Sequence, residues 1–129
     1  MFPMRKLRTL EECMAGAPMA VVEAAEFLKH ATELMPDSDR EELVAFVGAN
    51  PQAGEIIQAT GGVRKIRWAR KGMGKRGGAR VIYYYHNERL PVFLLSAYAK
   101  NRKANLSMTE RNAMKRLVPI LVAGYRRKV

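Results

Sequence analysis

The sequence predicts an α+β domain in which a small antiparallel sheet, a meander, is packed by two N-terminal helices and a C-terminal helix. Apolar residues recur at helical spacing in residues 24–47 and again after residue 107. Between residues 63 and 99 they follow the alternating or continuous patterns that are typical of strands. The chain has 129 residues, 48% of them hydrophobic, which is enough for one folded domain with its own core.

The first half predicts one short strand and two helices. These elements span residues 19–23, 24–35 and 39–47. Pro36 ends the first helix, because a proline disfavours the helical conformation in the residue before it. Ser38 and Glu41 match a capping box, in which the serine hydroxyl accepts a hydrogen bond from the amide three residues later, and Gly48 marks the end of the second helix. We expect both helices to cover one face of the sheet.

The second half predicts three consecutive strands followed by a helix. The strands span residues 63–70, 79–86 and 92–99. A glycine-rich connection and a short polar turn join them, as in an antiparallel meander. Ser107 and Glu110 form a second capping box, and an apolar stripe follows it. Pro119 lies inside that stripe and predicts a kink or break, because proline lacks the amide donor that the helix needs.

The composition limits the cellular compartment and the cofactors that we expect for the protein. The single cysteine, Cys13, can form no intramolecular disulfide and no zinc site of the cysteine type. No apolar run approaches the roughly 18 residues of a membrane span, and residues 1–18 lack the apolar core of a secretory signal. We therefore expect a cytoplasmic protein without a metal or other cofactor, in which residues 1–18 are a loosely ordered extension and residues 19–129 are the domain.

Charge is unevenly distributed along the chain. The net charge is +11, yet residues 1–55 carry five basic and ten acidic side chains, whereas residues 56–129 carry eighteen basic and two acidic ones. Such segregation creates a directed field that steers a polyanion onto one face. Nucleic acid or an acidic protein is therefore the expected partner.

The basic side chains are densest between Gly61 and His86. This stretch contains no acidic residue and eight basic ones: Arg64, Lys65, Arg67, Arg70, Lys71, Lys75, Arg76 and Arg80. Strand alternation places Lys65 and Arg67 on one face, about 7 Å apart. Two cations so close repel each other, and an anion such as a phosphate between them would offset this repulsion. An ATP-binding phosphate loop is excluded, because the Gly-Lys-Ser/Thr ending and the following helix are absent.

Three stretches together resemble the RelE/HigB family, the toxins of bacterial type II toxin-antitoxin systems in the RelE/ParE superfamily. They are residues 61–86, the strand end Leu94-Leu-Ser-Ala-Tyr-Ala-Lys-Asn101 and the helix start Leu106-Ser-Met-Thr-Glu-Arg111. The resemblance covers about residues 43–118. It implies a RelE-like fold and a metal-independent endoribonuclease that cuts mRNA on the ribosome (an mRNA interferase), inhibiting translation and arresting growth. It also implies a cognate antitoxin, for which a helix-turn-helix protein is one possibility.

The resemblance also suggests which residues act. The family's basic pair falls on Lys65 and Arg67, the basic residue opening the next strand on Arg80, and the basic residue after the last strand on Lys100. RNA supplies its own nucleophile, the 2′-hydroxyl, so the protein needs a proton-transfer group and cations for the phosphorane. We hypothesise Lys65 as the proton-transfer residue, since the like charges of Arg64, Arg67 and Arg80 should favour its neutral form. Arg67 and Arg80 would then bind the phosphate.

The family's base-stacking tyrosine has no aromatic counterpart in residues 102–106. Tyr84, Tyr98 and Trp68 are the aromatic candidates to replace it. The residues expected to contact RNA besides the three catalytic ones are Arg64, Arg70, Lys71, Lys75, Arg76, Tyr84, His86, Tyr98 and Lys100.

Two other functions are consistent with the sequence. A toxin similar to ParE would inhibit DNA gyrase without cutting RNA, but the basic pair on one strand face favours RNA. A non-catalytic module that binds nucleic acid or an antitoxin is the third reading, and the missing tyrosine supports it. Incorporation of labelled amino acids and thymidine, with primer extension on a known mRNA, separates these functions.

Overall fold

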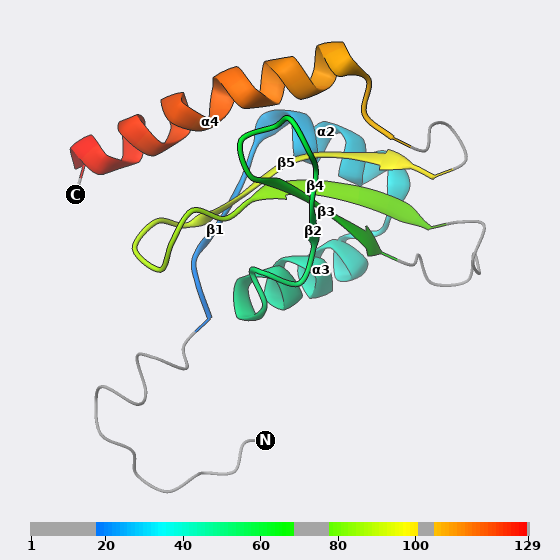
Figure 1. The fold of residues 1–129 in the computed structure, drawn as a ribbon. Helices are drawn as coiled ribbons and strands as arrows, with labels where there is room; N and C mark the ends of the chain where they lie inside the picture. Colours follow the sequence, from blue (N-terminus) through cyan, green and yellow to red (C-terminus); the bar gives the residue numbers. More distant parts are fainter. Residues whose placement is uncertain (1–17, 69–77, 101–104, 129) are drawn as a thin grey trace, which may run out of the picture.

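The computed structural model describes residues 18–68, 78–100 and 105–125, and the backbone alone of residues 126–128 at the end of the last helix. One five-stranded sheet lies between two helices on one face and a single long helix on the other (Figure 1). The elements follow in the order β1 (Val21–Glu23), α2 (Ala25–Leu34), α3 (Asp37–Ala49), β2 (Glu55–Ile56), β3 (Val63–Trp68), β4 (Ala79–Tyr84), β5 (Val92–Ala99) and α4 (Met108–Lys128). The predicted α+β class is confirmed, as are two helices before the meander and one after it.

The sheet has the strand order β1-β5-β4-β3-β2. The pairs β3/β4 and β4/β5 are antiparallel, which confirms the predicted meander. β1 pairs with β5 in parallel, with Val21 opposite Val92, so the whole sheet is mixed rather than purely antiparallel. β1 thus forms one edge, and β2 adds an antiparallel edge on the other side that the sequence did not predict. β2 has only two residues, both exposed, so it carries no apolar pattern.

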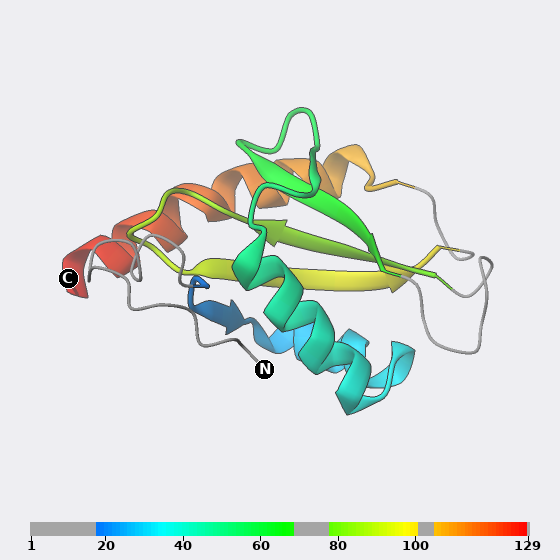
Figure 2. The ribbon, with the colours of Figure 1, turned by 90° about the horizontal axis from the view of Figure 1, so that it is seen from below.

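Both faces of the sheet are packed, and β4 supplies side chains to both. Val81 and Tyr83 point to the core under α2 and α3, whereas Ile82 and Tyr84 point to the core under α4. Successive side chains of a strand alternate between faces, which explains why all six residues of β4 are buried. In the view from below, α3 crosses in front of the sheet and α4 lies behind it (Figure 2). The sheet therefore has one face for the N-terminal helices and one that α4 crosses.

The two predicted capping boxes have different outcomes. At α4 the prediction is confirmed: the Glu110 amide donates to Ser107 Oγ at 3.1 Å, and the Ser107 amide donates to Glu110 Oε1 at 2.8 Å. At α3 it is wrong, because the helix already begins at Asp37 and no side chain caps it. Pro36 occupies the N-cap position there with a compatible φ of −69°, so Ser38 falls inside the first turn.

Two further expectations concern the ends of the chain. α4 runs unbroken through Pro119, so the expected break is absent from the helix. Of the predicted extension at residues 1–18, residues 1–17 lie outside the described part of the chain. Within the described residues, no helix has the length and apolarity needed to cross a bilayer.

Candidate nucleic-acid interface

Strand register places the predicted catalytic residues on one face of the sheet. Lys65 lies opposite Ile82, Arg67 lies opposite Arg80, and Arg80 in turn lies opposite Tyr98 on β5. Register partners share a face, and Ile82 and Tyr98 belong to the core on the α4 side. The cationic cluster, defined here as Lys65, Arg67 and Arg80, therefore lies on the face that α4 crosses, beside the Tyr98 ring.

Arg80 is the most buried member of the cationic cluster. Only 8% of its surface is exposed, and its Nε has no hydrogen-bond partner among the described residues. A buried guanidinium nitrogen without an acceptor is unfavourable, and the register partner Arg67 adds a second positive charge. A phosphate at this position would supply both the missing acceptor and the opposite charge.

Tyr98 lies at the edge of the cationic cluster in a mixed environment. Partial burial raises the pKa of its phenol, and the positive charge of Arg80 acts in the opposite direction. The phenol therefore remains a neutral hydrogen-bond donor, on a ring that is half-buried rather than enclosed. Of the three aromatic candidates, Tyr98 is the one that the structure brings to the cluster.

The chain before α4 contacts the cluster. Lys65 Nζ donates to Asn105 Oδ1 at 3.2 Å, which joins β3 to the residues leading into the helix. Arg111, in the first turns of α4, donates from Nε to the Leu106 carbonyl at 3.3 Å and lines a small cavity together with Lys65. Sequence reasoning did not place Asn105 or Arg111 in the site. Arg111 belongs to the helix start Leu106–Arg111, whose one signal in the sequence was the resemblance to the family, and Asn105 directly precedes it.

Arg64 lies on the opposite face from the cluster. Its register partner is Tyr83, in the core under α2 and α3. Its Nη1 donates to the carbonyls of Gly54, at 2.8 Å, and Gln52, at 3.2 Å. Arg64 thus holds the loop before β2, and the structure does not add its charge to the surroundings of Lys65 as expected.

Comparison with known protein families identifies the family of the chain. Residues 20–128 match the family model described as the RelE toxin of the RelE/RelB toxin-antitoxin system. This chain belongs to the RelE toxin family. It is therefore a toxin of a toxin-antitoxin system, with a cognate antitoxin as partner. A solved structure of the E. coli toxin RelE, a double arginine-to-alanine mutant in the free state, is 20% identical, with a TM-score of 0.48, and covers 67% of this chain and 88% of that one.

Three of the other candidate residues of this RelE-family toxin lie away from the cluster. Tyr84 is only 5% exposed, packs under α4, and its hydroxyl lies 2.8 Å from His86 Nδ1. His86 follows Arg80 by six positions, roughly 20 Å along an extended chain. The Trp68 ring packs against the Phe46 ring at a tilt of 46°, with centroids 5.6 Å apart, on the side of the N-terminal helices. None of these three candidates meets the cationic cluster.

The remaining predicted residues lie beyond β3 and β5. Lys100 directly follows β5, is exposed, and its amide donates to the Gly78 carbonyl at 3.1 Å. Arg70, Lys71, Lys75 and Arg76 lie within residues 69–77, outside the described residues.

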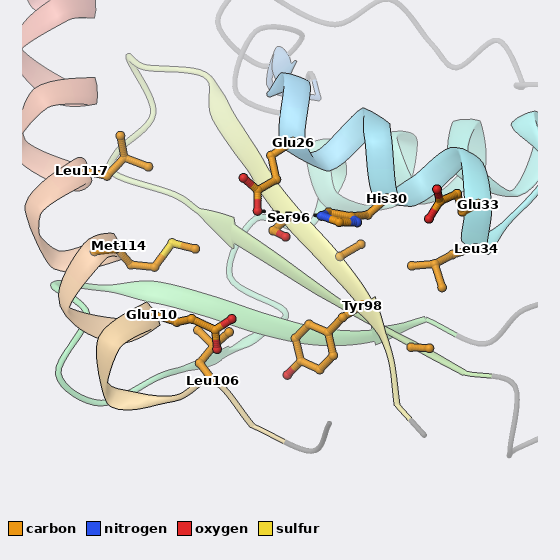
Figure 3. A pocket seen from close by; sticks show the side chains of 13 residues that line it. Glu26, His30, Glu33, Leu34, Ser96, Tyr98, Leu106, Glu110, Met114 and Leu117 are labelled. Carbon is orange, nitrogen blue, oxygen red and sulfur yellow. Dashed lines mark ion pairs between the residues drawn. The ribbon is translucent and has the colours of Figure 1, made fainter. Parts of the chain in front are cut away.

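A groove of about 840 Å³ runs beside the cluster in this RelE-family toxin, between α2, β5 and α4 (Figure 3). Glu26 and His30 face it from α2, and their side chains pair at 3.8 Å. Tyr98 and Glu110 project into it near the start of α4 (Figure 3). The groove is therefore acidic and partly apolar, in contrast to the cluster. No group of three or more histidine, cysteine or acidic side chains is placed to hold a metal ion within the described part of the chain.

Proposed function

We propose that this RelE-family toxin is a metal-independent endoribonuclease that cuts mRNA on the ribosome and so inhibits translation in the cytoplasm. The observation that supports the proposal most directly is the cationic cluster. Its three members come from two strands and share one face, and Arg80 is nine-tenths buried without an acceptor for its Nε among the described residues.

The chemistry needs little more than this cluster. The 2′-oxygen of one nucleotide attacks the adjacent phosphorus, the new 2′-O–P bond forms, and the P–O5′ bond breaks. One proton leaves the 2′-hydroxyl and one reaches the 5′-oxygen, so the products are a 2′,3′-cyclic phosphate and a 5′-hydroxyl. Lys65 is the proposed proton-transfer group, and Arg67 and Arg80 are proposed to bind the phosphate as negative charge accumulates.

The roles of Lys65 and Arg80 follow from their different surroundings. Lys65 is half-buried, and its ammonium is held by Asn105 from the segment before α4. Arg80 lies on β4, the strand between β3 and β5, and its side chain carries a planar fork of donors suited to a phosphate. Tyr98, directly opposite Arg80, is the proposed stacking platform for a base next to the bound phosphate.

The decisive experiment is expression of the chain from a tightly controlled promoter, with three readouts in parallel. These are incorporation of labelled amino acids, incorporation of thymidine, and primer extension on a known mRNA. Wild type should stop translation and produce codon-phased cuts, and a variant with alanine at Lys65, Arg67 and Arg80 should do neither. Lys29→Ala, an exposed lysine on α2, is the matched control and should remain toxic.

Each other result has a defined meaning. Unchanged growth arrest by the triple variant would overturn the assignment of the cluster. Loss of DNA synthesis without mRNA cuts would instead indicate a gyrase inhibitor similar to ParE. An absence of any effect of wild type would indicate a non-catalytic module whose partner is the antitoxin.

A further inference from the structure

A second, smaller cavity adjoins the cationic cluster on the side of the edge strand β2. Its volume is about 210 Å³, and its lining includes Lys65 and Arg111. The remaining lining residues are Glu55, Ile56, Ile57 and Gln58. The cavity thus forms where three segments distant in sequence meet: β2 with the residues after it, the middle of β3, and the first turns of α4.

Two cations therefore face one small space. Lys65 reaches it from β3 with its Nζ held by Asn105, and Arg111 reaches it from α4 with its Nε held by the Leu106 carbonyl. Each bond uses one donor, whereas an ammonium has three and a guanidinium five. Both groups are thus oriented by the protein and retain further donors for an anion.

Arg111 also borders the cluster on its other side. Its charge acts on the Tyr98 phenol together with that of Arg80. Burial and the charge of Glu110 raise the pKa of this phenol, whereas the two arginine charges lower it. Arg111 therefore belongs both to the lining of the small cavity and to the surroundings of the ring opposite Arg80.

One carboxylate opposes the two cations. Glu55 is the register partner of Lys65 and lines the same cavity, but its side chain is exposed. No salt bridge joins Glu55 to Lys65 or Arg111 in the described residues. The negative charge of Glu55 at the rim of the cavity therefore lowers its affinity for an anion, but Glu55 does not occupy the donors of Lys65 and Arg111.

We infer that this cavity is a second phosphate subsite, in which Arg111 binds the backbone phosphate next to the one that is cut, while Lys65 serves the reacting phosphate. The inference rests on the proposed function, which it deepens by naming Arg111 as a positioning residue for the RNA backbone. Arg111 fixes the neighbouring nucleotide so that the reacting phosphate meets Arg80 in the correct register. Glu55 limits the affinity of the subsite.

The test uses binding without cleavage. The probe is a single-stranded 2′-O-methyl oligoribonucleotide, which lacks the attacking hydroxyl, and its affinity for the full chain is measured across a series of salt concentrations. Arg111→Gln should weaken binding about five-fold and reduce the slope of log affinity against log salt by about 0.7, the value for one lost phosphate contact on a single strand. Arg111→Lys keeps the charge and should restore the slope.

Two further variants show whether the change in RNA binding comes from a charge at the subsite or from any change in the charge or stability of the protein. Arg116→Gln removes an exposed arginine from another side of α4 and should leave the slope close to that of wild type. Glu55→Gln removes the opposing carboxylate and should strengthen binding about two-fold. Thermal unfolding of each variant shows whether the fold is retained.

The outcomes distinguish this inference from the proposed function. If the triple alanine variant of the cluster loses binding and Arg111→Gln retains the wild-type slope, the subsite is refuted and the proposed function stands. The subsite is also refuted if Arg111→Lys behaves like Arg111→Gln, because the Leu106 bond and not the charge would then matter. If even the triple variant binds as wild type does, both fail.

Discussion

Arg67 and Arg80 lie directly opposite each other on neighbouring strands, so two guanidinium groups project from one pair of register positions. Arg67 is exposed, whereas Arg80 is 8% exposed. Like charges directly opposite each other destabilise a sheet, and the buried Nε of Arg80 has no acceptor among the described residues. This pair therefore costs stability in the free protein, and an anion would relieve the cost.

The first prediction concerns Arg80→Met, which keeps the length of the side chain and removes its charge. Replacing a buried charge by an apolar side chain is often neutral or stabilising, so the free energy of unfolding should stay the same or rise by about 1 kcal/mol. Cleavage of mRNA on purified ribosomes should fall by at least about 100-fold. Urea unfolding and primer extension measure the two effects. A stability loss above about 2 kcal/mol would show that an acceptor holds Arg80 in the free protein.

The second prediction concerns Tyr98, the aromatic side chain opposite Arg80. Tyr98→Phe keeps the ring and should retain most of the cleavage activity, whereas Tyr98→Ala should lose about 10-fold or more, since stacking of a base on a ring contributes about 1–3 kcal/mol. Tyr85→Ala, on the opposite side of the sheet, is the control for the loss of a partly buried ring. Equal activity of Tyr98→Phe and Tyr98→Ala would remove Tyr98 from the site.

The third prediction concerns pH. Burial raises the pKa of both Tyr83 and Tyr98 above the ordinary value of 10.0. The folded protein thus retains these protons at a pH where the unfolded chain has released them. The contribution of the two tyrosines to the free energy of unfolding is therefore fully present below about pH 10, and it is lost as the pH rises through the pKa values of the folded protein. In Tyr83→Phe, the decrease in the free energy of unfolding above about pH 10 should be shallower than in wild type. An unchanged slope would contradict the prediction.

The fourth prediction compares two glycines. A Cβ on Gly54 would lie 2.9 Å from the Lys65 carbonyl oxygen and 2.9 Å from the Tyr83 hydroxyl, whereas a Cβ on Gly124 would have no neighbour within 4 Å. Gly54→Ala should therefore destabilise the protein by about 1–3 kcal/mol. Gly124→Ala, inside α4, should stabilise it by about 0.5–1 kcal/mol. Thermal or urea unfolding of both variants checks the opposite signs.

The bond network around Gly54 explains why that change should also affect function. The Gly54 amide donates to the Tyr83 hydroxyl at 2.8 Å, and this hydroxyl donates to the Pro51 carbonyl at 2.9 Å. The next residue begins β2, whose two residues pair with β3 at Lys65 and Arg64. A shift of Gly54 would therefore move the wall of the smaller cavity.

The sequence predicted most elements because their determinants are local. Helical spacing, the Ser107–Glu110 capping box and the strand patterns after residue 62 each lie within a few positions of one another. The capping box at Ser38 misled because Pro36 starts the helix earlier, at Asp37. β2 was missed because its pairing depends on the loop that Arg64 holds, which is a long-range contact.

The site was partly predictable for the same reason. Alternation within one strand brought Lys65 and Arg67 together on one face, and the register of β4 added Arg80. The same alternation places Arg64 on the other face, which a count of neighbouring charges overlooks. Arg111 lines the cavity beside Lys65 because α4 folds back across the sheet (Figure 1), and nothing in the sequence around Arg111 predicts that contact.

β4 is the central strand of the sheet and is buried along its whole length, and Arg80 is part of it. The Arg80 side chain is thus nine-tenths buried on a strand that is paired on both sides, so much of the entropy of ordering it is lost during folding and not during binding. An incoming phosphate meets donors whose directions are already set, and little reorganisation remains for the moment of reaction. The charge that we propose to bind the phosphate is therefore part of the scaffold of this toxin, and an antitoxin that covers the surface above it would silence it.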